Sequence, residues 1–496
     1  DVKHYTLKQK VVQPQATMVI TDYKTGHVKA MAGGRNTVGV QLFNRAVNPR
    51  QPGSSIKPIA VYGAALQQSV EIMNGGSTPS FSTYDNAGNP VGNSYGKYFT
   101  AASVIDDAPL IVNGRQWPKN WYSGFRGLYT LRTSVQQSVN VNAVKVMQQI
   151  GVEYAADFSE KLGVSSIVRS GDTNDMNAAA LALGGMSKGI SPLEMASAYG
   201  TYPNEGTYLE PIIYTRVTNS RGDVILEKTP HSTEAVDPGV AFIMTDILKS
   251  VVSEGLGRGA SIGTQPVGGK TGTTTDNYDA WFVGFTPQYT AAVWIGNDVN
   301  IELSRGSAAA SSVWSKVMRQ VCSGLEAGSY PSQPENVIAL EIDTKSGLLP
   351  TQLSYLDDRG TVRYEYFVKG TEPTETDNVH KYVSACSYTG YLATPYCTAT
   401  YSRFGTMRPY AVSSSVGDIA YELPHYYCNL HNPDPSRYPI DPQYGGSGSA
   451  VTGNDINTDM PDPGLLDPEI TEPPSESGGG VTNTDPPIID APPDWL

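Results

Sequence analysis

Residues 266–296 read PVGGKTGTTTDNYDAWFVGFTPQYTAAVWIG, and this stretch decides the fold of the chain. It contains three runs rich in β-forming residues, at 266–276, 279–285 and 290–296. Few residues lie between the runs, and Thr286–Gln288 form a turn signal. Because short connections join antiparallel neighbours, the stretch predicts three consecutive antiparallel strands.

A second pair of strands is expected near the start of the chain. Residues 16–34 read ATMVITDYKTGHVKAMAGG, with β-rich runs at Thr17–Thr21 and His27–Met31 around a turn at Tyr23–Gly26. This pattern predicts a hairpin. Apolar spacing and capping signals predict helices near 54–70, 130–149, 154–162, 191–202, 237–255 and 308–322.

The simplest assembly of these elements is one five-stranded antiparallel sheet packed between helices. The insertion between the two blocks of strands forms a mostly helical lobe. Residues 71–127 are rich in Gly, Ser, Asn and Pro and are expected to be a long irregular excursion. We therefore predict an α/β chain of the α+β type for residues 16–325.

Two further regions follow this domain. Residues 326–440 are rich in Tyr and Thr and hold three of the four cysteines, which predicts a small β or irregular appendage. Residues 441–496 contain eleven acidic residues, no Lys or Arg, ten prolines and eight glycines. We expect this tail to be disordered, because its composition buries too little apolar surface to offset the entropy of ordering.

Charge argues against a dedicated nucleic-acid binder, and hydropathy argues against a membrane-spanning segment in this chain. The 496 residues carry a net charge of −13, of which residues 441–496 supply −11, so the rest is near neutral. A dedicated nucleic-acid binder normally has a basic face. No run approaches the ~18 apolar residues of a transmembrane helix, and no signal peptide is present. We expect either a mature or truncated form of a longer protein or a soluble protein.

Three short motifs carry the candidate chemistry, and their order makes them a stronger signal than any one alone. They are Ser54-Ser55-Ile56-Lys57, Ser138-Val139-Asn140 and Lys270-Thr271-Gly272-Thr273. Ser54 and Lys57 lie one helical turn apart. A partly buried lysine beside another cation has a lowered pKa and can serve as the base that a serine nucleophile needs. The six histidines are remote in sequence from these motifs and no G-x-S-x-G elbow is present, which favours a lysine base over a Ser-His-Asp triad.

The third motif is expected to line a cleft from a strand. Alternation along the strand directs Thr271 and Thr273 to one face and Lys270 and Gly272 to the other. Two hydroxyls can then bind a substrate carboxylate, and Gly272 lets a ligand approach the backbone closely. An oxyanion hole needs only two further N–H groups, that of Ser54 and one from the strand.

The motifs and their flanks resemble the transpeptidase domain of a class A, bifunctional penicillin-binding protein of Gram-positive type. The resemblance covers roughly residues 16–322. The matching stretches are FNRAVNPRQPGSSIKPI (43–59), WPKNW (117–121), FRG (125–127), QQSVNVNAVKV (136–146), SPLEMASAYGTYPNEG (191–206), VGGKTGTTTDNYDAWFVGFTP (267–287) and VWIGND (293–298). SGLEAG (323–328), ALEIDTKSGLLPT (339–351) and FVKGTEP (367–373) resemble the segment that often follows in Gram-positive members.

The resemblance implies the fold shared by penicillin-binding proteins and serine β-lactamases, and a peptidoglycan D,D-transpeptidase activity. It also implies a role for each motif residue. In the first two motifs, Ser54 is the acyl-accepting nucleophile, Lys57 the general base, Ser138 the proton relay and Asn140 the ligand of the substrate amide. In the third, Lys270 supplies the positive charge that holds the Ser138 side of the network, and Thr271 and Thr273, with Gly272 between them, bind the donor carboxylate; the N–H groups of Ser54 and Thr273 form the oxyanion hole.

The resemblance further implies the partners. The donor is a D-Ala-D-Ala stem peptide, the acceptor is an amine, and β-lactams mimic the donor, with no cofactor, metal or nucleic acid. The family normally begins with a cytoplasmic tail, a membrane helix and a glycosyltransferase domain, so residues 1–15 resemble a linker remnant. The full-length form is then anchored at the extracytoplasmic face of the membrane, near divisome or elongasome proteins. No glycosyltransferase motif is visible, so this chain alone should not polymerise glycan.

Two other functions use the same motifs. A D,D-carboxypeptidase or a serine β-lactamase hydrolyses the acyl-enzyme, and a non-catalytic β-lactam sensor keeps it. A β-lactamase needs a base for deacylation, such as an E-x-x-x-N loop between the second and third motifs, and we find none. The intact motifs do not exclude the sensor.

Several polar and aromatic residues near the motifs have structural explanations. Asp279 stands at a strand start, where a short acid bonds its own backbone. Glu194 is expected to be a first-turn helix carboxylate rather than a deacylating base. Trp117, Trp121 and Tyr122 either wall the donor groove or pack in the core.

The cysteines of the appendage leave the choice between a disulfide, a metal site and free thiols open. Cys386, Cys397 and Cys428 accompany an H-x-x-C-x-x-H pattern at 425–431, which matches no established zinc spacing. An exported protein favours a disulfide, and four cysteines allow three full pairings. Cys322, in an apolar helix, is expected to be a buried free thiol.

Overall fold

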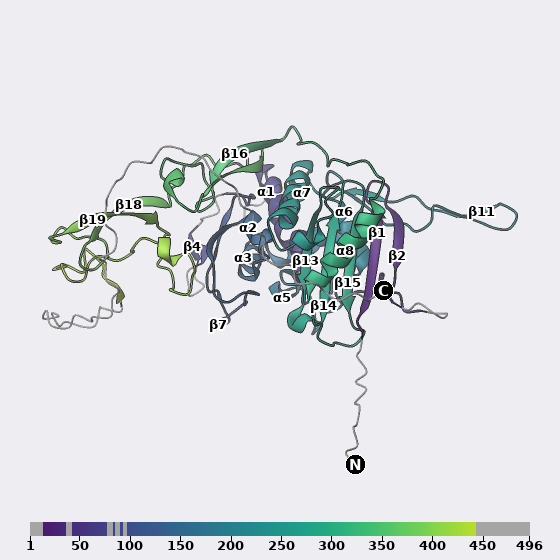
Figure 1. The fold of residues 1–496 in the computed structure, drawn as a ribbon, viewed down its shortest axis with the longest axis horizontal. Coiled ribbons are helices and arrows are strands. Elements are labelled where there is room, and N and C mark those ends of the chain that lie inside the picture. Colours follow the sequence, from purple (N-terminus) through teal and green to yellow (C-terminus); the bar gives the residue numbers. More distant parts are fainter. Residues whose placement is uncertain (1–12, 36–41, 77–82, 85–89, 93–96, 443–496) are drawn as a thin grey trace, which may run out of the picture. The chain divides into compact units, whose positions relative to one another are not determined.

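The computed structural model describes residues 13–35, 42–76, 83–84, 90–92 and 97–442. The chain divides into two compact units, Asp1–Asp441 and Pro442–Leu496. The second unit lies outside the described residues except for Pro442, and so does nearly all of the tail that we expect to be disordered. Figure 1 shows the described elements coloured along the sequence.

A five-stranded antiparallel sheet lies at the centre of the first unit, as predicted. Its strands are β1 (Gln15–Asp22), β2 (His27–Ala32), β13 (Gly268–Thr273), β14 (Asp279–Phe285) and β15 (Thr290–Gly296). The order β13-β14-β15-β1-β2 joins the two blocks of strands through β1 and β15 (Figure 1). Strand β13 is therefore an edge strand, and its outer side pairs with no other strand of the sheet.

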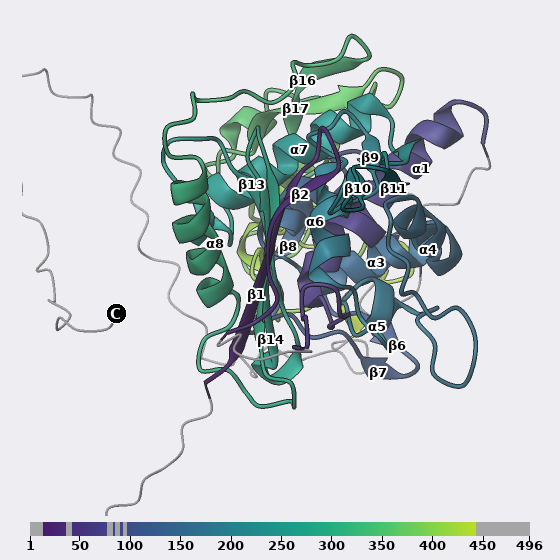
Figure 2. The ribbon, with the colours of Figure 1, turned by 90° about the vertical axis from the view of Figure 1, so that its right-hand side faces the viewer.

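Helices cover both faces of this sheet (Figure 2). Helix α8 (Ser307–Val321) packs on one face, where Phe282 meets Trp314. Helix α6 (Pro192–Gly200) packs on the other face, in the same core as Trp281. Neighbouring residues of one strand therefore enter different cores, as the period of two requires. This explains why β14 and β15 are apolar and buried along their whole lengths.

The helical lobe follows the predicted order with different boundaries. The helix expected over 54–70 begins as the 3₁₀ turn η1 (Gly53–Ile56), continues as the π-helical turn η2 (Pro58–Gly63) and ends as α1 (Ala64–Met73). The remaining helices are α2 (Leu131–Gln136), α3 (Asn140–Ile150), α4 (Val152–Lys161), α5 (Ala178–Leu181), α7 (Pro238–Ser253) and the 3₁₀ turns η3 (Arg258–Ala260) and η4 (Thr275–Asn277). Among the described residues, no helix combines the length and apolarity that crossing a membrane requires.

The single helix predicted over 130–149 is wrong. The structure divides it into α2 and α3, with Ser138 in the left-handed region at φ +55° between them. The N–H of Val139 closes the turn by donating to the carbonyl of Ser134 at 3.0 Å. Apolar spacing continues through the break, which is why the sequence pattern hides it.

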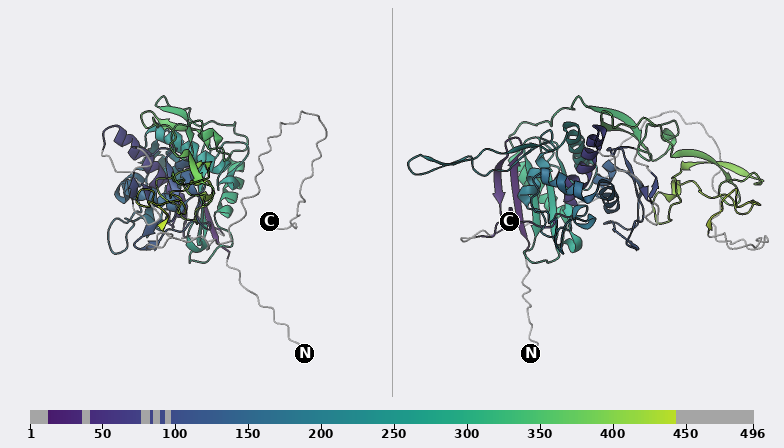
Figure 3. Two further views of the ribbon diagram at one scale, coloured as in Figure 1. Left: turned by 90° about the vertical axis from the view of Figure 1, so that its left-hand side faces the viewer. Right: turned by 180° about the vertical axis from the view of Figure 1, so that it is seen from behind.

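Short strands occupy regions that we expected to be irregular or did not assign. They pair in antiparallel twos, and the hairpins β6–β7 and β10–β11 lie in the chain between the strands of two wider pairs. The pairs are β3 (Thr83–Tyr84) with β4 (Pro90–Gly92), β5 (Val104–Asp107) with β8 (Gly127–Thr130), β6 (Ile111–Val112) with β7 (Arg115–Gln116), β9 (Thr207–Leu209) with β12 (Ser232–Glu234), and β10 (Arg216–Thr218) with β11 (Val224–Glu227). The β10–β11 hairpin projects from the sheet-bearing part of this unit (Figure 3).

The appendage consists of two hairpins and irregular chain, as predicted. Its strands are β16 (Val337–Asp343) with β17 (Val362–Val368), and β18 (His380–Cys386) with β19 (Thr400–Thr406), beside the 3₁₀ turns η5 (Ser354–Leu356) and η6 (Ile419–Tyr421). Buried ion pairs attach it to the helical lobe. Arg132 of α2 pairs with Glu365 of β17, and Arg408 pairs with Asp106 of β5 at 3.2 Å.

All four cysteines are free thiols, so the disulfide that we favoured is wrong. Cys386, Cys397 and Cys428 gather with His431 around one point instead of joining in a pair. Cys322 is buried, as expected of a thiol at the end of an apolar helix.

Candidate active site

The first motif begins where the chain packs against the edge strand β13. Gly53 has φ +52°, and a Cβ on it would lie 2.5 Å from the carbonyl oxygen of Thr273. A Cβ on Gly272 would lie 2.4 Å from the carbonyl oxygen of Pro52. Only glycine tolerates such approaches. The two glycines therefore let η1 lie directly against β13, which brings the start of the Ser54 turn to Thr273.

Ser54 differs from its neighbour Ser55 in its surroundings. It is the only residue between Pro52 and Leu66 that is partly exposed. Ser55 is completely buried, and its hydroxyl donates to the carbonyl of Pro52 at 2.7 Å. A nucleophile must reach its substrate, so the accessible hydroxyl of this pair is that of Ser54.

Two tyrosines, one in the last turn of α6 and one just after it, fix the turn that carries Ser54. Tyr199 donates its hydroxyl to the carbonyl of Ser55, and Tyr202 donates to the carbonyl of Pro58, both at 2.6 Å. Both side chains are buried. These bonds satisfy carbonyls in the irregular first turns, where regular helical partners are missing.

Lys57 reaches the second motif. Its Nζ lies 2.8 Å from the carbonyl oxygen of Ser138 and 2.7 Å from Oδ1 of Asn140. The side chain is completely buried, and no carboxylate of the described residues forms an ion pair with it. Burial, together with the charge of Lys270, holds the pKa of Lys57 well below the usual value for lysine. A neutral amine can accept a proton, as a general base must.

The second motif forms the break between α2 and α3. The left-handed conformation of Ser138 turns its carbonyl toward Lys57, and the side chain of Ser138 is itself buried. Asn140, the first residue of α3, accepts from Lys57 and donates its Nδ2 to the carbonyl of Lys119 at 2.8 Å. The turn is therefore held from both sides.

Asn120 is a residue of this site that the sequence did not single out. Its Oδ1 accepts from the N–H groups of Asn140 at 2.9 Å and Val141 at 3.3 Å, so it caps α3 from a distant loop. Its Nδ2 donates to Asp107 at 2.7 Å. The stretch WPKNW, which contains Asn120, was among those that resemble the family. The capping role of Asn120 could not be predicted, because a cap supplied from outside the helix leaves no local sequence pattern at the start of that helix.

Two aromatic residues of the same loop also fix the second motif. Trp121 donates its indole N–H to the carbonyl of Gln137 at 2.9 Å, although its ring is 55% exposed. Tyr122 donates its hydroxyl to Asp107 at 2.6 Å. Their hydrogen bonds support the turn at Ser138, and the exposed ring of Trp121 remains a candidate wall of the groove.

The third motif places a second buried lysine on β13. Lys270 is completely buried, and this burial lowers its pKa to about 7. Its Nζ donates to the carbonyl of Thr271 at 3.2 Å and lies 3.4 Å from the Thr271 hydroxyl. Thr273 accepts from the N–H of Ser307 at 3.3 Å. Each threonine hydroxyl accepts a hydrogen bond and still has its own proton to donate.

The three motifs thus meet, although not through every contact that we expected. Lys57 links the first motif to the second, and the glycine contacts link the first to the third. Among the described residues no hydrogen bond joins Lys270 to Ser138, and none joins Lys57 to the Ser54 hydroxyl. The role of Lys270 toward Ser138 therefore stays a prediction.

Comparison with known proteins identifies this arrangement. Residues 96–321 match the penicillin-binding protein transpeptidase domain, and residues 333–382 match the C-terminal domain of penicillin-binding protein 1A. The chain carries the transpeptidase domain of a class A penicillin-binding protein.

Relatives and solved structures agree with this assignment. Penicillin-binding protein 1A of Clostridium botulinum (strain Langeland) is 36% identical over 433 residues, which are 84% of this chain and 48% of the relative. The chain thus spans about half of that relative's length. Penicillin-binding protein 1A of Haemophilus influenzae has a similar structure, with TM-score 0.57, 26% identity and coverage of 74% of this chain and 55% of that one. PonA1 of Mycobacterium tuberculosis, solved with penicillin V, has the same fold at TM-score 0.53 and 24% identity, over 66% of this chain and 83% of that one.

Two other candidates in the transpeptidase domain are structural, as expected. Asp279 accepts from the indole N–H of Trp294 at 2.8 Å and from the Thr274 hydroxyl at 3.1 Å, which fixes the start of β14. Glu194 completes a capping box with Ser191 at the start of α6. Neither carboxylate is available as a base.

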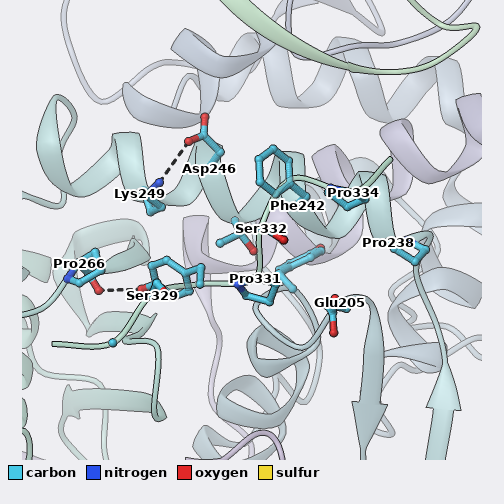
Figure 4. Close-up of a pocket in the computed structure, with 14 residues that line it drawn as sticks. Glu205, Pro238, Phe242, Asp246, Lys249, Pro266, Ser329, Pro331, Ser332 and Pro334 are labelled. Carbon is cyan, nitrogen blue, oxygen red and sulfur yellow. Dashed lines mark hydrogen bonds and ion pairs between the residues drawn. The ribbon is translucent and has the colours of Figure 1, made fainter. Parts of the chain in front are cut away.

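A separate hollow of about 280 Å³ lies elsewhere in the domain (Figure 4). Phe242, Asp246 and Lys249 of α7 line one side, and the segment 328–334 lines the other. Asp246 and Lys249 form an ion pair at 3.4 Å. None of the motif residues lines this hollow. It is a gap between α7 and the segment 328–334 that leads to the appendage, and it is not part of the active site.

Proposed function

We propose that this domain is a peptidoglycan D,D-transpeptidase that forms an acyl-enzyme on Ser54. Ser54 Oγ attacks the carbonyl carbon of the penultimate D-Ala of a stem peptide, forms an ester and expels the terminal D-Ala. An acceptor amine of a second stem peptide then attacks the ester. This step forms the cross-linking amide and restores the Ser54 hydroxyl.

The environment of Lys57 is the observation that carries this proposal. A buried lysine that has no carboxylate partner among the described residues and lies next to a second cation has a lowered pKa and can act as a neutral base. Lys57 takes the proton of Ser54, and Ser138 passes a proton to the amine of the leaving D-Ala. When the acceptor amine attacks, the proton moves in the reverse direction.

The remaining motif residues bind the donor. Thr271, Thr273 and the positive charge of Lys270 receive its terminal carboxylate. Asn140 binds the substrate amide with the Nδ2 proton that Lys119 does not use. The N–H groups of Ser54 and Thr273 stabilise the oxyanion, and Gly272 leaves the donor room to lie along β13.

The family assignment supports two further parts of the proposal. β-Lactams acylate Ser54 because they present a strained amide in place of the donor, and a solved relative holds penicillin V. We place the domain on the extracytoplasmic face of the membrane, where peptidoglycan is assembled, with divisome or elongasome proteins among its partners.

Mass spectrometry after incubation with penicillin V tests the nucleophile. We expect one covalent adduct per chain on the peptide that contains Ser54, none in Ser54→Ala, and an undiminished adduct in Ser55→Ala. Thermal unfolding verifies that Ser54→Ala is folded. An adduct that persists in Ser54→Ala contradicts the assignment.

A thioester donor with an amine acceptor tests the reaction. A transpeptidase joins the donor acyl group to the acceptor, a carboxypeptidase releases only the free acid, and a sensor releases neither. Aminolysis that disappears in Ser54→Ala supports the proposal, and hydrolysis alone overturns it.

A further inference from the structure

Four side chains of the appendage meet at one point from three separate segments. Cys386 ends β18, Cys397 follows the turn at Thr394, and Cys428 and His431 lie near the end of the described chain. Their three Sγ atoms and one imidazole nitrogen all lie within 4.8 Å of one another. Cys386 and Cys428 are completely buried.

Two distances within this group match those of a tetrahedral metal site. His431 Nδ1 lies 3.5 Å from Sγ of Cys386 and 3.5 Å from Sγ of Cys428. In tetrahedral zinc, bonds of about 2.3 Å to sulfur and about 2.05 Å to nitrogen separate the two ligand atoms by about 3.5 Å. A disulfide needs two sulfurs about 2.05 Å apart, and all the sulfurs here are free.

The surrounding backbone supports deprotonated sulfur. The N–H of Thr394 donates to Sγ of Cys397, and the N–H of His431 donates to Sγ of Cys428, both at 3.3 Å. The Thr394 hydroxyl also donates to the carbonyl of His431, which ties the two segments together. Such outer contacts orient the ligands of metal sites.

The appendage has a structural need for such a site. Beyond β17, its buried apolar residues are few, and two of them are cysteines of this group; the set is Ala385, Cys386, Val416, Leu423 and Cys428. A region with so small a core normally depends on disulfides or a metal for its stability. No disulfide is present in the appendage.

We propose that Cys386, Cys397, Cys428 and His431 bind one Zn²⁺ as a structural Cys₃His site. Three thiolates and a neutral imidazole suit zinc, and binding releases the thiol protons to solvent. All four tetrahedral positions are filled by protein, so the site has no open position for catalysis. In the part of the chain that the structure describes, one further group of this kind consists of Asp343, Asp377 and His380. It is already joined by hydrogen bonds within itself and to Asp357, and needs no ion.

Metal analysis of the whole chain tests the proposal. The chain is isolated anaerobically without chelator or added reductant, and its zinc is measured by inductively coupled plasma mass spectrometry. We expect one zinc per chain in the unmodified protein and a loss of most of it in Cys428→Ser and His431→Ala. Cys322→Ser and His425→Ala, which change a cysteine and a histidine outside the group, should keep one zinc.

A second measurement requires no variant. Replacement of zinc by Co²⁺ in the unmodified chain should give a thiolate-to-cobalt charge-transfer band and the intense visible bands of tetrahedral cobalt. Chelation should expose three additional thiols to alkylation and lower the melting temperature, with penicillin acylation of Ser54 unchanged. Three results would overturn the proposal. They are a chain without stoichiometric zinc, cobalt spectra of octahedral type, and an intact mass lower by two hydrogens, which reveals a disulfide in this group.

Discussion

The active site and the seam between the helical lobe and the appendage both bury cations, but they surround them differently. Lys57 and Lys270 are completely buried next to carbonyl, amide and hydroxyl oxygens, with no carboxylate in ion-pair contact among the described residues. At the seam, Arg132 pairs with Glu365 and with Asp246. Arg408 is surrounded by carboxylates of Asp106, Asp418 and Glu422.

The pKa values respond in opposite directions. Burial lowers the pKa of both lysines, so each loses its proton more readily than a surface lysine. Lys270, with a pKa of about 7, still carries its charge in about half of the molecules at pH 7. Burial also opposes the charge of Arg132, but Glu365 and Asp246 outweigh it and raise its pKa. The site therefore keeps cations whose protons can move, and the seam keeps cations whose charge is fixed. Substitutions should affect chemistry in the first region and stability in the second.

The largest expected effect separates the two lysines of the site. Lys57→Arg should reduce the second-order rate of acylation by penicillin by about 10²–10⁴-fold, because arginine cannot lose a proton at working pH and loss of a general base has this cost. Lys270→Arg should keep measurable acylation with weaker donor binding, since positive charge is its proposed contribution. Stopped-flow or labelling kinetics measure both variants, and thermal melts verify their folding. Equal damage by the two substitutions, or milder damage by Lys57→Arg, contradicts this division of roles.

A smaller effect, on stability, is expected at the seam. Arg132→Met leaves the Glu365 carboxylate buried and unpaired, and should lower the free energy of unfolding by about 3–5 kcal/mol. Arg132→Met/Glu365→Met should recover most of this loss, because no charge remains buried. Urea unfolding measures all three proteins. In each variant that remains folded, the rate of acylation by penicillin should stay near that of the unmodified chain. A loss of rate comparable with that of Lys57→Arg would show that the seam is not separate from the site.

Sequence patterns predicted the sheet and the approach of the three motifs better than the contacts that support them. The sheet and three motifs are local in the chain: alternation places β13, β14 and β15, and Ser54 and Lys57 stand three residues apart. The break at Ser138 and the cap by Asn120 are different, because each depends on a contact with a distant segment. Apolar spacing alone continues through Ser138 and therefore predicted one helix.

The appendage was predicted less well for the same physical reason. Its strands have recognisable composition, but Cys386, Cys397, Cys428 and His431 come together only after three segments fold. The H-x-x-C-x-x-H pattern matches no established zinc spacing and an exported protein favours a disulfide, so the sequence favoured a disulfide that the structure does not contain. Buried pairs such as Arg132 with Glu365 also join residues far apart in the chain.

The smallest expected effect is a difference in how stability depends on pH. Burial lowers the pKa of Lys270 to about 7 in the folded chain, whereas an unfolded lysine titrates near about 10.4. Between these values the unfolded chain binds a proton that the folded chain does not, so the free energy of unfolding rises with pH, by up to about 1.4 kcal/mol per pH unit for one group.

Lys270→Met removes this contribution. The unmodified chain should therefore gain stability relative to Lys270→Met from about pH 7 to about pH 9, a window below the titration of unfolded tyrosine. Arg132→Met/Glu365→Met should instead run parallel to the unmodified chain, because arginine stays charged throughout and no unpaired carboxylate is left buried in this variant. Urea unfolding at several pH values measures the three curves, and parallel curves for Lys270→Met and the unmodified chain would show that Lys270 keeps its proton in the folded site.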